Sequence, residues 1–257
     1  MPAILDARGL CKTFGAVTAA NEVSAAIEKD SVVGLIGTNG AGKTTFINMI
    51  TGYIKPDRGS IAYEGRDITA LPPRDITRLG ICRSFQIPQL YRSLSVFDNM
   101  MVGLGIVLRN AGVAGFFSLR DGPVPGYGKS APEVAEHLLE RFGLADYRNR
   151  DAQVLPGGAH KLLDIALTMV AKPRVLLLDE PTSGVSAEEK FGIMQMVLDA
   201  VRAAGATVLF VEHDMEIVSR FAQRVLAFYD GRIIADAAPQ VALEDPEVQR
   251  YVAGTRA

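Results

Sequence analysis

One eight-residue stretch limits what this chain can fold into more than any other. Residues 37–44 read Gly-Thr-Asn-Gly-Ala-Gly-Lys-Thr, which fits the phosphate-loop pattern of two glycines, a lysine and a hydroxyl residue at fixed spacing. That pattern requires a strand before it and a helix after it. An apolar run precedes the motif at 32–36, and residues 45–50 have the character of the first turns of a helix. We therefore predict a strand, a loop and a helix here.

The glycines of this loop predict that its backbone can curve closely around a bound anion. Without β-carbons, the N–H groups can converge on phosphate oxygens, and the positive end of the following helix adds to the attraction. We expect Lys43 to reach the β- and γ-phosphates of a nucleotide, and the Thr44 hydroxyl to bind Mg²⁺. A glycine-rich turn with an incidental lysine is the alternative. The candidate phosphate-binding residues are Gly37, Thr38, Asn39, Gly40, Ala41, Gly42, Lys43, Thr44 and Thr45.

Composition excludes several other classes of protein. The 257 residues are 48% hydrophobic, enough to bury a large core. A net charge of −2 gives no electrostatic case for a nucleic-acid partner. The two cysteines, Cys11 and Cys82, are too few for a disulfide framework or a metal site. We see no signal peptide and no run of roughly 20 apolar residues, so we expect the chain to reach a membrane only by docking on another protein.

Strand-like and helix-like segments alternate along most of the chain. Predicted strands cover 4–10, 23–27, 32–36, 60–63, 80–85, 174–178, 207–211, 225–229 and 233–235, with a turn at 12–15. Predicted helices cover 72–79, 96–108, 132–142, 161–170, 187–204, 215–222, 239–243 and 245–252. This alternation indicates an α/β fold with a mainly parallel sheet, and a helical block inserted from about 96 to 171. Ligands of such sheets lie at the carboxyl ends of the strands.

Two acids end a predicted buried strand. Asp179 and Glu180 follow the apolar run 175–178. A buried carboxylate is costly unless a cation or a donor faces it, and beside a phosphate loop Asp179 is a natural Mg²⁺ partner. Glu180 is then placed to orient and polarise the attacking water. The alternative is an ordinary strand end with solvated acids.

Three further residues are candidates for the nucleotide site because of their positions in the chain alone. His213 follows the predicted strand 207–211, where it would lie near the γ-phosphate, although a lone histidine is usually a hydrogen-bonded surface residue. Gln86 follows the predicted strand 80–85, and its amide suits a metal ligand or a water-holding group. Phe14 precedes the phosphate loop and suits stacking on an adenine ring; a core aromatic at a strand end explains it equally well.

Taken together, these motifs resemble the ATP-binding subunit of an ABC transporter. The resemblance rests on the phosphate loop, Gln86, the segment 155–159, the acids after 175–178 and His213, and it covers essentially the whole chain. It implies an α/β fold with a RecA-like P-loop NTPase core, an antiparallel β-subdomain and an inserted α-helical subdomain. It also implies ATP and Mg²⁺ as cofactors. Within one ABC domain, 1–257, the core and β-subdomain would cover about 1–86 and 172–237, the helical subdomain about 87–171, and a tail 238–257.

The family's signature sequence is altered here. Where the family reads Leu-Ser-Gly-Gly-Gln, residues 155–159 read Leu-Pro-Gly-Gly-Ala. The resemblance implies that Pro156, Gly157 and Gly158 face the ATP held by a partner's phosphate loop in a head-to-tail pair. Pro156 has neither a hydroxyl nor an N–H. Either it weakens the partner's site, or it fits the first turn of the following helix and is tolerated. The segment after Gly184 also lacks the aspartate that is common in the family.

The resemblance narrows to one branch of the family. The glycine- and proline-rich stretch 110–130, residues 211–215 and the tail 245–252 resemble the branched-chain amino acid uptake branch, which also includes importers of amides, urea and aromatic acids. It implies permease subunits and a second ATP-binding subunit as partners, a heterodimer rather than a homodimer, a solute-binding protein acting indirectly, and no nucleic acid. The chain would lie peripherally on the cytoplasmic face of the plasma membrane. Ile87, Leu90 and Tyr91 are candidates for the permease-docking groove, or for packing within the helical subdomain.

Two other functions compete with this one. The first is a soluble ABC ATPase in DNA repair or translation; the coiled coils, zinc motifs and basic linkers usual in that class are not seen in the sequence. The second is a non-catalytic ATP-binding partner that regulates a competent ATPase. Pro156 favours it, and the presence of Glu180 argues against it.

Overall fold

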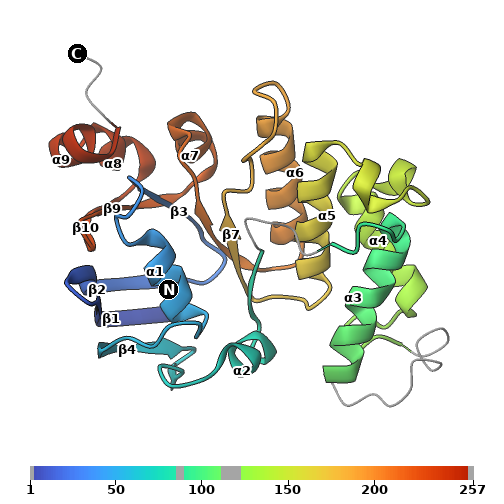
Figure 1. Cartoon of the computed structure of the whole chain (residues 1–257), viewed down its shortest axis with the longest axis horizontal. Coiled ribbons are helices and arrows are strands. Elements are labelled where there is room, and N and C mark those ends of the chain that lie inside the picture. Colours follow the sequence, from blue (N-terminus) through green and yellow to red (C-terminus); the bar gives the residue numbers. More distant parts are fainter. Residues whose placement is uncertain (1–2, 85–89, 111–122, 254–257) are drawn as a thin grey trace. The chain divides into compact units, whose positions relative to one another are not determined.

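The computed structural model describes residues 3–84, 90–110 and 123–253. Gln86 and Ile87 lie outside the described residues. The strands are β1 (Ala3–Phe14), β2 (Val17–Glu28), β3 (Val32–Gly37), β4 (Arg58–Tyr63), β5 (Arg66–Asp67), β6 (Ile81–Arg83), β7 (Val175–Asp179), β8 (Thr207–Val211), β9 (Arg224–Tyr229) and β10 (Arg232–Ala237). The α-helices are α1 (Lys43–Ile50), α2 (Pro73–Arg78), α3 (Val96–Asn110), α4 (Ala131–Arg141), α5 (Gly157–Met169), α6 (Lys190–Ala203), α7 (Met215–Phe221), α8 (Pro239–Glu244) and α9 (Pro246–Val248) (Figure 1).

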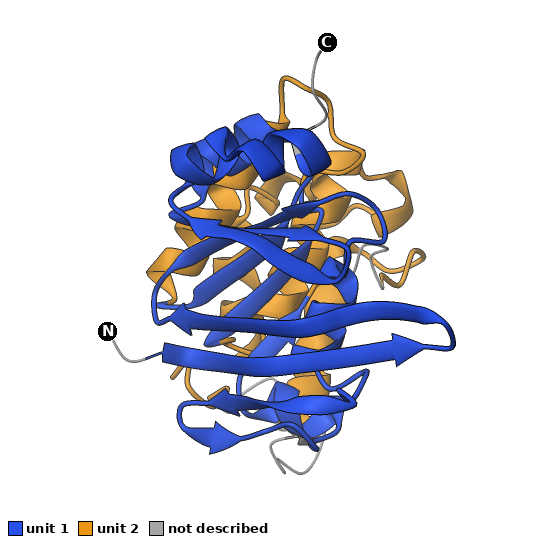
Figure 2. Ribbon diagram, turned by 90° about the vertical axis from the view of Figure 1, so that its left-hand side faces the viewer, with its two compact units in different colours: residues 1–83, 174–181, 205–257 blue, residues 84–173, 182–204 orange. Residues whose placement is uncertain are grey.

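These elements form two compact units, coloured separately in Figure 2. Unit 1 comprises Met1–Arg83, Arg174–Pro181 and Gly205–Ala257, and contains every strand among the described residues. Unit 2 comprises Ser84–Pro173 and Thr182–Ala204, and its regular elements are helices. The proposed boundaries of the three subdomains stay a prediction.

Unit 1 contains a six-stranded sheet in the order β10-β9-β3-β8-β7-β6. Five strands are parallel, and β10 pairs antiparallel with β9 at the edge. Strands β3, β7 and β8 are buried along their whole length, as expected for the central strands of a parallel sheet. Their pairing sets Asp179 beside Val211, and Val211 beside Leu35. The carboxyl ends of β3, β7 and β8 therefore meet at one edge.

A second, antiparallel sheet in unit 1 has the order β2-β1-β4-β5. Here the predicted turn at 12–15 is wrong, because β1 continues to Phe14 and pairs Thr13 with Thr18 and Phe14 with Val17. The chain reverses only at Gly15 and Ala16. Register shifts along the β1–β2 pair break the apolar alternation and explain why the sequence pattern stopped early.

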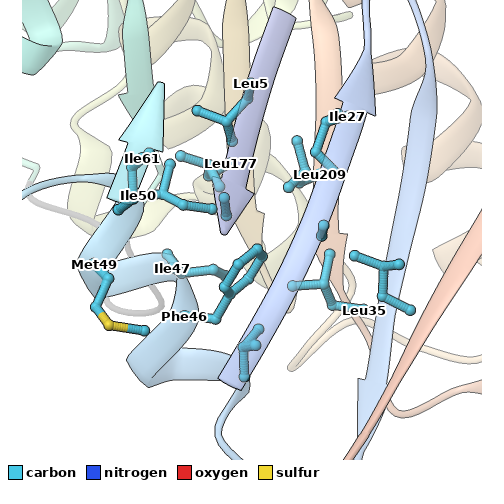
Figure 3. Close-up of a cluster of buried hydrophobic side chains, with 14 of the residues drawn as sticks. Leu5, Ile27, Leu35, Phe46, Ile47, Met49, Ile50, Ile61, Leu177 and Leu209 are labelled. Carbon is cyan, nitrogen blue, oxygen red and sulfur yellow. The ribbon is translucent and has the colours of Figure 1, made fainter. Parts of the chain in front are cut away.

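The helix that follows the phosphate loop is held by the core of unit 1. Phe46, Ile47, Met49 and Ile50 of α1 are buried in one cluster with Leu5 and Ile27 of the antiparallel sheet and with Leu35, Leu177 and Leu209 of the parallel sheet (Figure 3). The Phe46 ring lies 5.5 Å from that of Phe228, centroid to centroid. Truncating a buried phenylalanine of this kind costs about 3–5 kcal/mol. The position of α1 is thus fixed by packing.

Unit 2 is built from α3, α4, α5 and α6. Helix α4 begins with a capping box, in which the Ser130 N–H donates to the Glu133 carboxylate at 2.8 Å. Helix α5 begins at Gly157, four residues before the predicted start at 161. Its first two residues are glycines, which have low helix propensity, so the sequence pattern concealed the true start. Among the described residues, none of the helices has the length and apolar character needed to cross a bilayer.

The C-terminal tail belongs to unit 1. The predicted helix 245–252 is a short turn, α9, followed by a π-helical segment, Gln249–Ala253. Asp245 begins it by accepting from the N–H of Glu247 at 2.8 Å. The ring of Tyr251 stacks on that of Tyr229 with centroids 4.3 Å apart. The tail is thereby attached to the end of β9.

Candidate active site

The phosphate loop starts at the end of β3 and runs directly into α1. Gly37 and Gly42 have φ values of +150° and +107°. A β-carbon on Gly37 would lie 2.5 Å from the Phe228 carbonyl oxygen, and one on Gly42 would lie 2.7 Å from the Ala19 carbonyl oxygen. Only glycine fits either position without displacing backbone. The predicted strand, loop and helix are all present.

A turn from the far end of the chain supports this loop. The Gly231 N–H donates to the Ala41 carbonyl at 3.1 Å, and the Asn21 N–H donates to the Gly231 carbonyl at 2.8 Å. The β9–β10 turn therefore joins the phosphate loop to β2. These main-chain bonds hold the loop in one conformation before any ligand arrives, which lowers the entropic cost of binding.

The Lys43 side chain folds back over its own loop. Its ammonium donates to the carbonyl oxygens of Gly37, at 2.6 Å, and Thr38, at 3.0 Å. The residue is only 6% exposed. Burial lowers the pKa of Lys43, and the nearby carboxylates of Glu180 and Asp179 oppose that shift. A cation short of solvent is thus held inside the loop, where an incoming phosphate would meet it.

The two acids leave β7 in different directions. Asp179 ends the strand and is buried, and its Oδ2 accepts from Arg83 Nη2 at 2.5 Å. Glu180 has φ +48°, in the left-handed region, and its N–H donates to the Val211 carbonyl at 3.1 Å. A non-glycine residue in this region carries strain of about 1–3 kcal/mol, and such strain concentrates at functional sites. The backbone bond to β8 holds Glu180 in place.

Glu180 also meets the predicted histidine. His213 Nε2 lies 3.3 Å from Glu180 Oε1. The main chain around His213 is fixed, because Asp214 begins α7 by accepting from the N–H of Glu216 at 2.9 Å. The structure therefore brings together Lys43, Asp179, Glu180 and His213 from the ends of three neighbouring strands.

The remaining predicted residues fall into three groups. The Phe14 side chain is 48% exposed at the tip of the β1–β2 hairpin, so it is not a core aromatic; Lys12 Nζ lies 5.6 Å from its ring centre. Pro156, Gly157 and Gly158 belong to unit 2. There Pro156 occupies the N-cap position of α5, with no side-chain hydrogen bond at the cap. Gln86 lies outside the described residues.

Sequence reasoning missed two side chains at the site, those of Arg83 and Asn48. Arg83, at the end of β6, bonds both Asp179 and, through Nη1, the Asn48 amide oxygen at 2.6 Å. The sequence did contain a signal for Arg83, because a cationic residue at the end of an apolar strand, close to Gln86, suits a partner for an acid at the site. The sequence did not show, however, that β6 lies beside β7, because the whole helical block separates them in the chain.

The residues present fit a nucleoside triphosphate with a divalent cation. The loop offers a cradle that a β-carbon would fill, and Lys43 supplies positive charge inside it. The Thr44 side chain is exposed at the start of α1, and Asp179 adds a carboxylate from the neighbouring strand end. Hydroxyl and carboxylate oxygens are the ligands that Mg²⁺ prefers.

Comparisons with known proteins agree with this chemistry. A family model described as "ABC transporter" matches residues 20–183. The high-affinity branched-chain amino acid transport ATP-binding protein BraF of Pseudomonas aeruginosa is 34% identical over 254 residues, covering 98% of each chain. LivG of Salmonella typhimurium, which carries the same description, is 33% identical with the same coverage. A probable LivG of Archaeoglobus fulgidus is 34% identical over 256 residues, covering 98% of this chain and 96% of its own.

Solved structures show the same architecture. An ATP-binding cassette of an ABC transporter in its ADP conformation superposes with a TM-score of 0.81 at 30% identity, covering 97% of this chain and 98% of its own. A nucleotide-free cassette gives 0.79 at 32% identity, covering 96% and 97%. The expected fold, a P-loop core with an antiparallel β-subdomain and helices, is confirmed.

Proposed function

The chain belongs to the ABC transporter family and is an ATP-binding, ATP-hydrolysing subunit; on that premise we propose that it energises an importer of branched-chain amino acids, or of related small amides, urea or carboxylates. The observation that carries this proposal is full-length similarity: relatives named for branched-chain amino acid transport align over 98% of this chain. Direction and solute come from those relatives' names.

The geometry supports a division of labour at the ATP. Lys43 and the N–H groups of the loop bind the β- and γ-phosphates, which the same contacts hold in line for attack. Thr44 and Asp179 would hold Mg²⁺, which would neutralise charge on the phosphates when bound. Glu180 orients and polarises the attacking water. His213, with a proton on Nε2, donates to Glu180 and keeps its carboxylate aimed. Phe14 would stack on the adenine ring, and the amide of Gln86 would ligate the metal or hold the water.

The signature segment is proposed to serve a partner subunit's ATP. Pro156 is extended (ψ 154°), and its carbonyl accepts from the N–H of His160 at 3.0 Å to begin α5. Proline therefore fits this position without interrupting the helix, and the first N–H groups of α5 are without acceptors inside the helix, as at any helix N-terminus. A serine hydroxyl is nevertheless missing, and one charge-assisted hydrogen bond is worth about 1.5–3 kcal/mol.

The proposed partners follow from the transporter role. They are membrane permease subunits, a second ATP-binding subunit in a heterodimer, and indirectly a solute-binding protein. The chain then lies peripherally on the cytoplasmic face of the plasma membrane. Leu90 is partly buried and Tyr91 is 54% exposed. The Tyr91 main chain is fixed by Asn99 of α3, which accepts from its N–H at 2.9 Å and donates to its carbonyl at 3.1 Å. A rigid backbone with an exposed aromatic suits a docking surface.

One alternative keeps a specific observation in its favour. A regulatory subunit that binds ATP without hydrolysing it would explain Pro156. The contact between His213 and Glu180 argues against that role, because a subunit that does not hydrolyse ATP has no need of a carboxylate held toward the attacking water. This chain combines an altered signature segment with a complete phosphate loop. A heterodimer in which one of the two ATP sites is weakened requires that combination in one of its subunits.

Affinity capture from membranes tests the proposal. The tagged chain is recovered after gentle solubilisation, and its copurifying proteins are identified. We expect a permease and a second, distinct ATPase, together with loss of branched-chain amino acid uptake in cells that lack the chain. Recovery of the permease without a second ATPase would contradict the heterodimer. Recovery only from the soluble fraction, with ribosomal or nucleic-acid partners, would contradict transport.

A further inference from the structure

Arg83 links three elements next to the proposed metal site. It is the last residue of β6, and its two terminal nitrogens bond different partners. Nη2 lies 2.5 Å from Asp179 Oδ2 at the end of β7, and Nη1 donates to Asn48 Oδ1 of α1 at 2.6 Å. The side chains of Arg83 and Asp179 are only 12% and 10% exposed. This is a largely desolvated ion pair with shared hydrogen bonding, unlike the surface pairs elsewhere in unit 1.

The placement of Asn48 puts the guanidinium on the metal side of α1. Asn48 lies four residues after Thr44, and residues at this spacing share a face of a helix. Thr44 and Asp179 are the proposed Mg²⁺ ligands. Arg83 therefore bonds Asp179 directly. Through Asn48 it also bonds the face of α1 that carries Thr44.

An arginine here acts as a permanent cation. Its guanidinium does not lose its proton in proteins, and a buried carboxylate needs a counter-charge. In the absence of metal, Arg83 supplies that charge to Asp179. When a divalent cation binds, it approaches a carboxylate that already carries a positive partner, and the two cations repel each other.

We propose that Arg83 is the resident counter-cation of the metal site and sets how strongly nucleotide binding depends on Mg²⁺. This inference rests on the proposed role of Asp179 as the Mg²⁺ partner. Arg83 favours binding of metal-free nucleotide, because it adds positive charge near the phosphates. It disfavours the metal, because it occupies Asp179 Oδ2. Both effects reduce the difference in affinity between ATP and Mg²⁺–ATP.

A purely structural role for Arg83 makes a different prediction. If the guanidinium only braces β6, β7 and α1, its removal lowers thermal stability and weakens both forms of the nucleotide equally. The ratio of the two dissociation constants then does not change. This ratio, Kd with excess EDTA divided by Kd with excess Mg²⁺, separates the two roles.

The experiment measures that ratio on the full-length chain with a fluorescent, non-hydrolysable ATP analogue. We expect Arg83→Gln to raise the ratio by about tenfold, through tighter binding with Mg²⁺ and weaker binding without it. Arg83→Lys keeps the charge and is expected to stay within about threefold of the wild-type ratio. Mn²⁺ bound in the presence of the analogue, measured by electron paramagnetic resonance, should show a lower metal Kd in Arg83→Gln.

Arg174→Gln is the matched control. Arg174 precedes β7, at the other end of the strand that Asp179 ends, and pairs with Glu64. Its removal deletes an equal charge from the same sheet and is expected to leave the ratio unchanged. Arg83→Met keeps the apolar part of the side chain and replaces Arg83→Gln in the measurement if the glutamine variant does not fold.

Two outcomes overturn the inference and are distinguishable. If Mg²⁺ strengthens binding to the wild type but not to Asp179→Asn, while Arg83→Gln and Arg83→Met keep the wild-type ratio, only the role of Arg83 is wrong. If Mg²⁺ changes the affinity of neither the wild type nor Arg83→Gln, the proposed metal site itself is wrong.

Discussion

His213 Nε2 lies 3.3 Å from Glu180 Oε1, which joins the residue after β8 to the residue after β7. Neither side chain depends on the other for its backbone position. Glu180 is fixed by its N–H bond to Val211, and His213 by the start of α7. The contact is therefore a property of the sheet edge, and it aims the carboxylate in a fixed direction.

Glu180→Gln should abolish hydrolysis while leaving nucleotide binding intact. The amide keeps the shape of the side chain but cannot accept a proton, and general base catalysis contributes about 10²–10⁴-fold. Phosphate release by the assembled complex measures the rate, and a bound fluorescent analogue measures affinity. Glu244→Gln, an exposed change in α8, is the control. Equal turnover by Glu180→Gln and wild type would remove Glu180 from the mechanism.

His213→Ala should slow hydrolysis by about tenfold to a hundredfold. A hydrogen bond to a charged group is worth about 1.5–3 kcal/mol, and each 1.36 kcal/mol in the barrier is tenfold in rate. His213→Gln supplies a neutral N–H donor and should recover part of the loss. ATPase rates of the three proteins check this. If His213→Gln were as slow as His213→Ala, the donor role would not hold.

Lys43→Met should abolish ATP binding and raise the stability of the nucleotide-free chain. The pKa of Lys43 is lowered by burial, so at neutral pH the folded state holds a charge that the unfolded state carries at lower cost. Replacing Lys43 by methionine removes this destabilising charge from the folded state. The gain in stability is present when the pH is below the pKa of lysine in the unfolded chain, near 10.4. The Tm of nucleotide-free Lys43→Met, measured by thermal unfolding at neutral pH, should therefore be higher than that of the wild type.

The pH dependence of the stability gain in Lys43→Met tests whether the buried charge is its cause. As pH rises through the interval between the lowered folded pKa and the unfolded pKa, the wild-type lysine becomes neutral and the penalty disappears. The difference in Tm between Lys43→Met and wild type should therefore shrink as the solution becomes alkaline. A difference that grew with pH would have the opposite sign and would contradict this reasoning. Arg220→Met, an exposed change in α7, controls for loss of positive charge.

Gly42→Ala should weaken ATP binding by at least about tenfold. The new β-carbon would lie 2.7 Å from the Ala19 carbonyl oxygen at φ +107°, so the loop or β2 must move. Gly40→Ala is the control, because it lies in the same loop at φ +81° with nothing within 4 Å of its β-carbon. Both variants carry backbone strain, but only Gly42→Ala adds a collision. Calorimetric titration with ATP should show the larger loss for Gly42→Ala.

Pro156→Ser should raise the ATPase rate of the assembled complex by roughly tenfold to a hundredfold, if the missing hydroxyl acts in the transition state. Pro156 already occupies the N-cap position, where serine is among the preferred residues, so the variant should fold normally. Steady-state hydrolysis with and without the change measures the effect. An unchanged rate would show that proline is tolerated at this position.

The sheet edge was predictable because its strands are apolar runs that end in polar residues. The apolar run 175–178 is followed by Asp179 and Glu180, and the apolar run 208–211 is followed by Glu212 and His213. The two strands that contain these runs, β7 and β8, are neighbours in the sheet. The phosphate loop has a spacing that few other structures share. Position along the chain was therefore enough to bring Lys43, Asp179, Glu180 and His213 to one edge.

What the sequence concealed depends on neighbours that are distant in the chain. Arg83 meets Asp179 because β6 pairs with β7 across 96 residues, and no local pattern records that pairing. The end of β1 was missed because its register shifts disturb the alternation. The start of α5 was missed because Gly157 and Gly158 disfavour helix in isolation, and tertiary packing overrides that preference.

The bond from the Val32 N–H to Gln223 Oε1 spans 191 residues, and this separation has a consequence during biosynthesis. At about 5–20 residues per second, a ribosome takes roughly 10–40 s to make the intervening chain. Throughout that interval the nascent phosphate loop lacks β9 beside β3 and lacks Gly231 against Ala41. The growing chain therefore cannot acquire full affinity for ATP until its last strands emerge, and cellular nucleotide can stabilise only a nearly finished subunit.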